Sequence, residues 1–124
     1  MTFAHCIFCA PEREILAESA LALAVFDSYP VSPGHALVVP KRHVTTIFDM
    51  AGDEYDECFR LVRALKDVLL ARFSPDGFYV GANCGEASGQ SVWHAHIHVI
   101  PRYQGDVPNP RGGVRGVIPL KANY

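Results

Sequence analysis

Three histidines separated by single residues limit the backbone conformations open to residues 92–101. His94, His96 and His98, here called the histidine row, alternate with apolar side chains. The apolar residues are Trp93, Ala95, Ile97 and Val99. Successive side chains of a strand point to opposite faces, so the segment predicts a strand with one apolar face and one face of imidazoles. Because the apolar side chains already supply core packing, the histidine row is left for chemistry.

A long helix is predicted over residues 53–73. Its apolar residues recur at steps of three and four, which places them on one helix face. They are Tyr55, Phe59, Val62, Leu65, Leu69 and Phe73. Acidic residues crowd the first turn, Arg72 lies in the last turn, and a Ser-Pro-Asp-Gly segment follows.

Shorter apolar segments predict strands at residues 14–18, 20–26, 35–40 and 78–83, in addition to residues 92–101. Strands, one main helix and further strands indicate an α+β fold with a mainly antiparallel sheet. At 124 residues the chain has room for a single domain, residues 1–124. Proline and glycine dominate residues 104–124, which we expect to form an extended C-terminal arm.

Composition narrows the classes of partner. A net charge of -2 gives no reason to expect a nucleic-acid partner. The most apolar stretch, residues 20–26, is far shorter than the roughly 20 residues that span a bilayer, so no membrane partner is expected. The amino-terminal residues lack the pattern of a signal peptide, and we expect a cytoplasmic protein.

Two chemistries suit the histidine row: a metal site, or nucleophilic attack by one imidazole while a neighbour handles protons or charge. The preceding loop helps to decide between them. Gly85 and Gly89 offer backbone amides, Gln90 a carboxamide and Ser91 a hydroxyl, all donors suited to phosphate oxygens. A loop of this kind directly before the histidine row favours phosphate chemistry. Separately, the Cys6–Cys9 pair has the spacing of a metal or redox site in a reducing compartment.

Three segments resemble the histidine triad superfamily of nucleotide hydrolases and transferases. They are residues 89–100 (GQSVWHAHIHVI), residues 33–43 (PGHALVVPKRH) and residues 6–9 (CIFC). Together they lie within a match that extends from Cys6 to Arg102. The resemblance implies a five-stranded antiparallel sheet with one long helix and a short helix, assembled as a two-fold homodimer.

The resemblance also implies roles for individual residues. His96 falls at the position of the family's nucleophile, and His98 where the family contacts the phosphate and the departing group. The implied substrate contacts are Asp27, Asn83, Gly89, Gln90, Ser91 and His98. Asp27 falls at a ribose-binding position, where a carboxylate accepts bonds from both hydroxyls; the alternative is a simple turn residue. His35 matches a position near the active site, without an assigned role.

A structural zinc is the implied cofactor, held by Cys6, Cys9, His43 and His94 as in zinc-bearing members. Two thiolates and two imidazoles would complete a tetrahedral site with no open position. His5 is the rival fourth ligand, and free thiols without metal are the alternative.

The expected function is hydrolysis that releases a nucleoside monophosphate, AMP, through a nucleotidyl-histidine intermediate. The two substrate classes are dinucleoside polyphosphates and nucleoside phosphoramidates. Residues 101–106 resemble the first branch somewhat more, and Arg111 and Arg115 of the arm are expected to hold extra phosphates. Phe8 and Phe26 are expected to line an apolar base cleft with loose base preference. A nucleotidyl transferase and a non-enzymatic nucleotide-binding scaffold are the alternatives.

Overall fold

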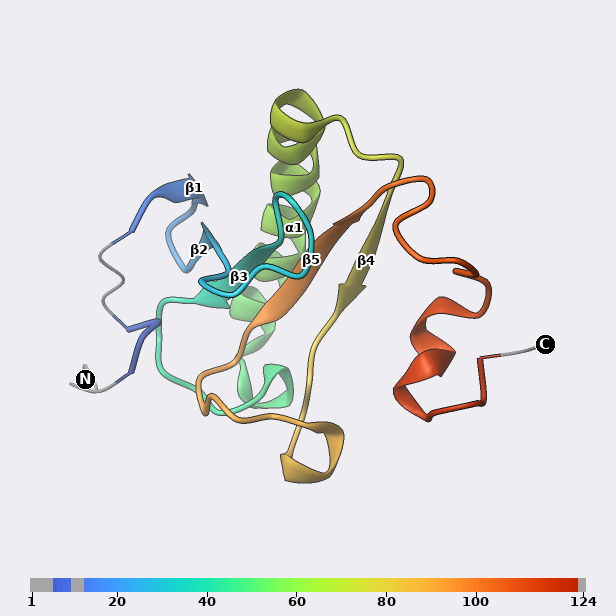
Figure 1. Cartoon of the computed structure of the whole chain (residues 1–124). Coiled ribbons are helices and arrows are strands. Elements are labelled where there is room, and N and C mark those ends of the chain that lie inside the picture. The colour runs from blue at the N-terminus through green and yellow to red at the C-terminus, as the bar shows by residue number, and fades with distance from the viewer. Residues whose placement is uncertain (1–5, 10–12, 123–124) are drawn as a thin grey trace.

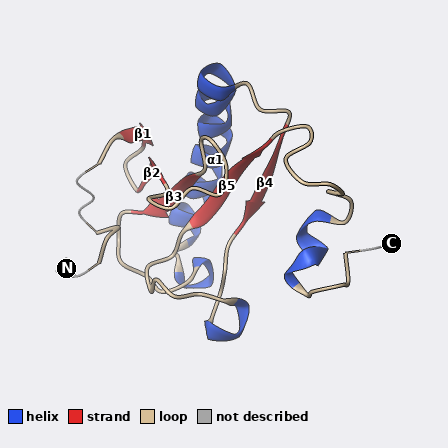
Figure 2. Cartoon of the chain, viewed as in Figure 1, coloured by secondary structure: helices blue, strands red, loops and turns tan. Residues whose placement is uncertain are grey.

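Five antiparallel strands form one sheet in the order β1-β2-β3-β5-β4 (Figure 1). The computed structural model describes residues 6–9 and 13–122. The strands are β1 (Ile15–Glu18), β2 (Ala22–Phe26), β3 (Ala36–Pro40), β4 (Gly77–Gly81) and β5 (Ile97–Arg102). The long helix α1 (Gly52–Phe73) lies against one face of the sheet, and a short 3-10 helix (Ile47–Asp49) precedes it (Figure 2). The predicted fold class is confirmed.

The core between α1 and the sheet uses a helix stripe different from the predicted one. The buried helix residues are Glu54, Cys58, Leu61, Leu65 and Leu69. Leu65 and Leu69 are fully buried, as predicted. Tyr55 and Phe59 were expected on the same face but are each 39% exposed, with their rings 5.0 Å apart. In the first half of the helix the stripe therefore runs through Glu54 and Cys58, one residue before each predicted aromatic.

The histidine row does not lie in a single strand, which corrects the prediction for residues 92–101. β5 begins only at Ile97, so His98 is in the strand while His94 and His96 precede it. Pairing of β3 with β5 ends at Val38 and Ile97. Two residues further along β3, Pro40 has no N–H to offer a ladder, and its carbonyl accepts instead from the His94 ring nitrogen Nε2 at 2.8 Å.

The apolar alternation of this segment holds only in part. Ala95, Ile97 and Val99 are buried at 1%, 2% and 0% exposure, as a helix-covered strand requires. Trp93, predicted on the same face, is 46% exposed. Because it precedes β5, the two-residue alternation of a strand does not govern its direction.

A buried carboxylate joins the start of α1 to the segment that follows β3. Glu54 accepts from the Ala51 backbone N–H at 2.7 Å and from Arg42 at 2.6 and 3.0 Å. The hydrogen bond from Arg42 is the main reason that the pKa of Glu54 is lowered, so the pair stays charged. This clamp fixes the path of the chain around His43.

The C-terminal arm contains more structure than its composition predicted. Residues Gly113–Val117 form a 3-10 helix beside the edge strand β4 (Figure 1). Gly112 has φ +92°, and a Cβ there would clash with the carbonyl of Ala122, so glycine is needed for the chain to return on itself. Among the described residues, no helix has both the length and the apolar content needed to cross a membrane.

Candidate functional site

The sheet face opposite α1 carries a cavity of about 490 Å³, here called the histidine cavity. It brings together six of the residues singled out in the sequence: Asp27, Asn83, Gln90, Ser91, His96 and His98. Gly89 is not in its lining; it takes φ +89° at the end of a 3-10 turn (Glu86–Ser88). Segments far apart in the sequence thus meet at one site.

The apolar wall of this cavity differs from the expectation for the base cleft. Phe8 lines the cavity and is 3% exposed. Phe26 is absent from the lining and packs instead edge-on against Phe73 with ring centroids 6.0 Å apart. Its place in the wall is taken by Leu37, which follows from β3 alternation and was not anticipated.

Arg13 is a cavity residue that the sequence analysis missed. Its guanidinium donates to the carbonyl of Phe26 at 2.7 Å and lies 5.7 Å from the Phe8 ring centroid. It is the lining residue with a permanent positive charge, a natural partner for an anionic ligand. No motif surrounds it, so no sequence signal marked it.

His96 has a defined tautomer. Its ring nitrogen Nδ1 lies 2.8 Å from the carbonyl oxygen of His94, and a carbonyl can only accept, so Nδ1 carries the hydrogen. In the neutral tautomer with hydrogen on Nδ1, the lone pair is on Nε2. The ring lies 5.2 Å from the Phe8 ring and 5.1 Å from the His98 ring, measured between centroids. An unprotonated imidazole nitrogen at a cavity wall can act as a nucleophile without a separate base.

His98 is oriented by a chain of hydrogen bonds that begins at the backbone. The Val31 N–H donates to Nδ1 of His35 at 3.1 Å, so His35 carries its hydrogen on Nε2. That nitrogen lies 2.9 Å from Nδ1 of His98 and donates to it. The hydrogen of neutral His98 is therefore on Nε2. These hydrogen bonds give a role to the buried His35, because it determines which ring nitrogen of His98 carries the hydrogen.

The carboxylate of Asp27 lies beside this chain. Its Oδ2 is 3.5 Å from Nε2 of His35, and its Oδ1 accepts from the Tyr29 N–H at 2.8 Å. Asp27 thus holds the turn, the alternative considered for it, and also lines the cavity. Asp27, His35 and His98 are close enough to share a metal. A metal on Nε2 of His35 would require a fully deprotonated ring, because Nδ1 already accepts from Val31, so a hydrogen-bonded chain fits better.

Burial keeps the hydrogen-bonded rings of His35 and His98 neutral. Burial is the main cause that lowers the pKa of His98 to about 4, and the neighbouring His96 and His35 lower it further. Burial likewise lowers the pKa of His35, against the opposing effect of Asp27. Both rings are therefore uncharged at pH 7.

This lowered pKa predicts acid sensitivity of the fold. As the pH falls from 6.5 to about 4, the unfolded chain binds a proton at His98 that the folded chain does not, so stability decreases. We expect the free energy of unfolding to drop by about 3 kcal/mol from this group, measured by urea unfolding at pH 7 and pH 4. The His98→Gln variant should show a smaller drop; an identical pH dependence in both proteins would contradict the prediction.

Gln90 shapes the loop before the histidine row. Its Oε1 accepts from the Gly85 N–H at 2.8 Å, and its Nε2 donates to the carbonyls of Thr45 and Val92 at 2.7 and 3.1 Å. The buried carboxamide is thus engaged with backbone on both sides. Ser91 follows directly, exposed at the cavity, with its hydroxyl available to a ligand.

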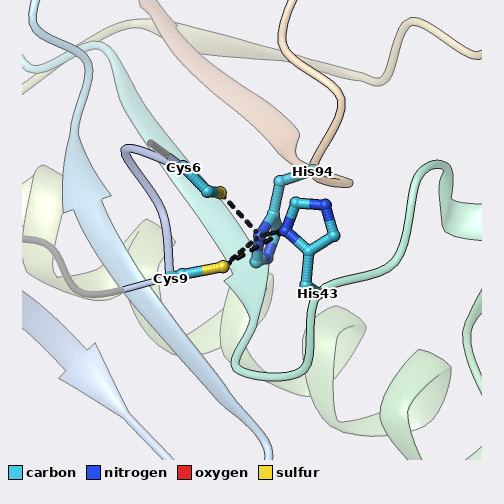
Figure 3. A group of neighbouring side chains, drawn as sticks. All are labelled: Cys6, Cys9, His43 and His94. Atoms are coloured by element: carbon cyan, nitrogen blue, oxygen red, sulfur yellow. Dashed lines mark hydrogen bonds between the residues drawn. The ribbon is translucent and has the colours of Figure 1, made fainter. Parts of the chain in front are cut away.

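Cys6, Cys9, His43 and His94 come together in one cluster (Figure 3). Nδ1 of His94 lies 3.2 Å from the Cys6 sulfur, 3.5 Å from the Cys9 sulfur and 3.2 Å from Nδ1 of His43. The Cys9 sulfur is also 3.2 Å from Nδ1 of His43. Ligand atoms of a tetrahedral zinc are about 3.3 Å apart for two nitrogens and about 3.6 Å apart for a nitrogen and a sulfur, so these separations are within about 0.4 Å of those the ion needs.

The protonation of His94 supports a metal-binding cluster. Its Nε2 donates to the Pro40 carbonyl, so Nδ1 has a lone pair and faces two sulfurs and a nitrogen. A backbone partner on the second ring nitrogen is the usual arrangement for a metal-bound histidine. The rival ligand His5 lies outside the described residues.

The histidine cavity on one face of the sheet and the Cys2His2 cluster beside it can be compared with known proteins through a sequence match. Residues 11–105 match the HIT domain family, which covers more than half of the chain. The chain belongs to the HIT, or histidine triad, family, which confirms the resemblance noted above.

Two relatives indicate nucleotide chemistry. The bis(5'-adenosyl)-triphosphatase of Dictyostelium discoideum is 35% identical over 98 residues, which cover 79% of this chain and 66% of the relative. The AP-4-A phosphorylase of Mycobacterium tuberculosis is 38% identical over 96 residues, or 77% of this chain and 49% of the relative. Family membership and these relatives together support a nucleotide hydrolase or transferase.

Two solved structures share the fold. A HIT family protein from Bacillus anthracis has a TM-score of 0.77 and 35% identity, with 85% of this chain and 78% of that chain covered. A Zn-bound histidine triad family protein from Mycobacterium smegmatis has a TM-score of 0.75 and 28% identity, with 85% and 80% covered. The second is consistent with a structural zinc in the Cys2His2 cluster.

Proposed function

We propose that this chain is a nucleotide hydrolase that releases AMP from a dinucleoside polyphosphate or a nucleoside phosphoramidate. One observation carries the proposal: the bond from Nδ1 of His96 to the His94 carbonyl leaves Nε2 of His96 unprotonated at the cavity, beside the His98 ring. The two histidines then have opposite properties, a lone pair on one and an N–H on the other. Attack on phosphorus and stabilisation of a departing oxygen need that difference.

In the proposed reaction, Nε2 of His96 attacks the α-phosphorus and displaces the departing group. The N–H on Nε2 of His98 donates a hydrogen bond to the departing atom, which is an oxygen in a dinucleoside polyphosphate and a nitrogen in a phosphoramidate. Ser91, Asn83 and the loop amides meet the phosphoryl oxygens. Asp27 accepts from the ribose hydroxyls. Water then attacks the nucleotidyl-His96 and releases AMP.

The nucleoside is proposed to lie against the apolar wall that contains Phe8 and Leu37. A wall of this kind discriminates weakly between bases, so adenine preference over guanine stays modest in the proposal. Arg13, whose guanidinium lies over the Phe8 ring, supplies the positive charge of the cavity in the proposal.

Cys6, Cys9, His43 and His94 would hold the zinc. With four protein ligands and no open position, such an ion ties the segment that contains Phe8 to the residue that orients His96 and has no place for substrate. The two-fold dimer and the cytoplasmic location remain predictions.

A transferase is the second candidate, favoured by the relative named AP-4-A phosphorylase. The covalent step would be the same, with phosphate in place of water as the acceptor. Turnover measured with and without inorganic phosphate separates the two, since a phosphorylase forms a nucleoside diphosphate as product.

The direct test is rapid quenching with diadenosine tetraphosphate or adenosine phosphoramidate, followed by mass spectrometry of peptides that contain residues 92–102. We expect an acid-labile nucleotidyl adduct on His96. Tight AMP binding without adduct or turnover would instead indicate a non-enzymatic nucleotide-binding scaffold.

A further inference from the structure

A second cavity, of about 510 Å³, lies on the same sheet face as the histidine cavity. It is bounded by β4, β5 and the 3-10 helix of the arm, and its lining includes Val31, Tyr79, Ile100 and Val117. Ile100 follows His98 by two residues in β5, so both side chains point to the same face, about 7 Å apart along the strand. The second cavity therefore lies next to the histidine cavity along β5.

The side chain of Tyr79 lines the second cavity and extends toward His98. Tyr79 pairs with Ile100, and Gly81 pairs with His98, in the antiparallel register of β4 and β5. A Cβ built on Gly81 would lie 3.0 Å from Tyr79 Cε1 and 3.3 Å from the Tyr79 hydroxyl. The phenol ring thus lies over Gly81, toward His98, in space that only a glycine at position 81 leaves free.

The charged residues that line the second cavity balance one another, which favours an uncharged part of a ligand. The lining cation, Arg102, forms two hydrogen bonds with Asp106, at 2.7 and 2.9 Å. Because this pair is balanced, the cavity has no excess positive charge for a phosphate chain. An aromatic ring on Tyr79 and aliphatic side chains around it fit a base and its sugar.

We propose that the second cavity binds the nucleoside of the departing group, so that the substrate class is a dinucleoside polyphosphate and not a phosphoramidate. This inference rests on the proposed function. The first nucleoside occupies the histidine cavity, the bridging phosphates pass His98, and the second base stacks on Tyr79. A phosphoramidate, whose departing group is ammonia or an amine, leaves this cavity unused.

The test compares two substrates in one variant. Loss of a base–aromatic stack in Tyr79→Ala should lower kcat/KM for diadenosine tetraphosphate, relative to that for adenosine phosphoramidate, by roughly tenfold to a hundredfold. Tyr79→Phe keeps the ring and should keep the ratio. Val80→Ala changes the neighbouring residue of β4, which lies outside both cavity linings, and serves as the matched control.

A second variant guards against a folding defect in Tyr79→Ala. Gly81→Ala displaces the Tyr79 ring, so it should lower the same ratio, and the double variant should be no worse than Tyr79→Ala alone. Equal loss on both substrates, or no change in the ratio, would overturn the inference. Absence of turnover on both substrates in the unmodified protein would overturn the proposed function instead.

Discussion

Replacement of His96 by alanine is expected to lower turnover on the order of ten-thousandfold or more, while AMP still binds. The variant loses the atom proposed to form the bond to phosphorus, and no other lining side chain among the described residues has an imidazole tautomer fixed by a bond to a backbone carbonyl. Single-turnover kinetics with diadenosine tetraphosphate measure the rate, and AMP titration measures binding.

Two companion variants make the His96 result specific. His98→Ala and Ser91→Ala each remove one proposed donor to the reacting group and should slow turnover about a hundredfold, with residual activity. Turnover that survives in His96→Ala at the level of these two variants would contradict a nucleotidyl-histidine mechanism.

Metal removal should have the largest effect on stability. If the Cys2His2 cluster holds zinc, purified protein contains about one zinc per chain, and its loss lowers the free energy of unfolding by about 4 kcal/mol, the value for a ligand at a thousand times its Kd. Cys9→Ser should show the same loss, with chemistry retained in the folded fraction. Metal analysis and thermal unfolding measure both.

A matched control is available within the chain. Cys84 is a free thiol outside the cluster, so Cys84→Ser should change neither metal content nor melting temperature. A metal-free protein that melts at the same temperature as the metal-loaded one would end the zinc proposal.

The sequence predicted which helices and strands form better than it predicted the residues at which they begin and end. Alternation placed Ile97 and Val99 correctly, because their burial follows directly from strand geometry, and the continuous apolar segment at residues 35–40 correctly predicted β3. Alternation failed for Trp93, since the strand ladder stops at Ile97 and Pro40 offers no N–H beyond it. Helical periodicity correctly predicted that Leu65 and Leu69 of α1 are buried. In the first half of α1 it predicted burial of Tyr55 and Phe59, which are partly exposed.

The residues of the candidate site that belong to a sequence motif could be predicted, and the others could not. The C-x-x-C spacing and the histidine row marked residues that do meet, and the family resemblance grouped Cys6, Cys9, His43 and His94. Arg13 and Tyr79 have no motif, because their positions depend on packing against Phe8 and across Gly81. The role of His35 required the direction of a single backbone N–H, which only coordinates supply.

The contact between Cys6 and His94 joins residues 88 positions apart in the chain. Long-range contacts cost loop-closure entropy before they form, so we expect α1 and the β2–β3 hairpin to form before the amino-terminal segment docks. In that order, His94 would receive its sulfur neighbours late, at a residue whose carbonyl accepts from His96. During refolding, the proposed nucleophile would then acquire its orientation near the end of the pathway, and we expect metal uptake to mark completion of the fold.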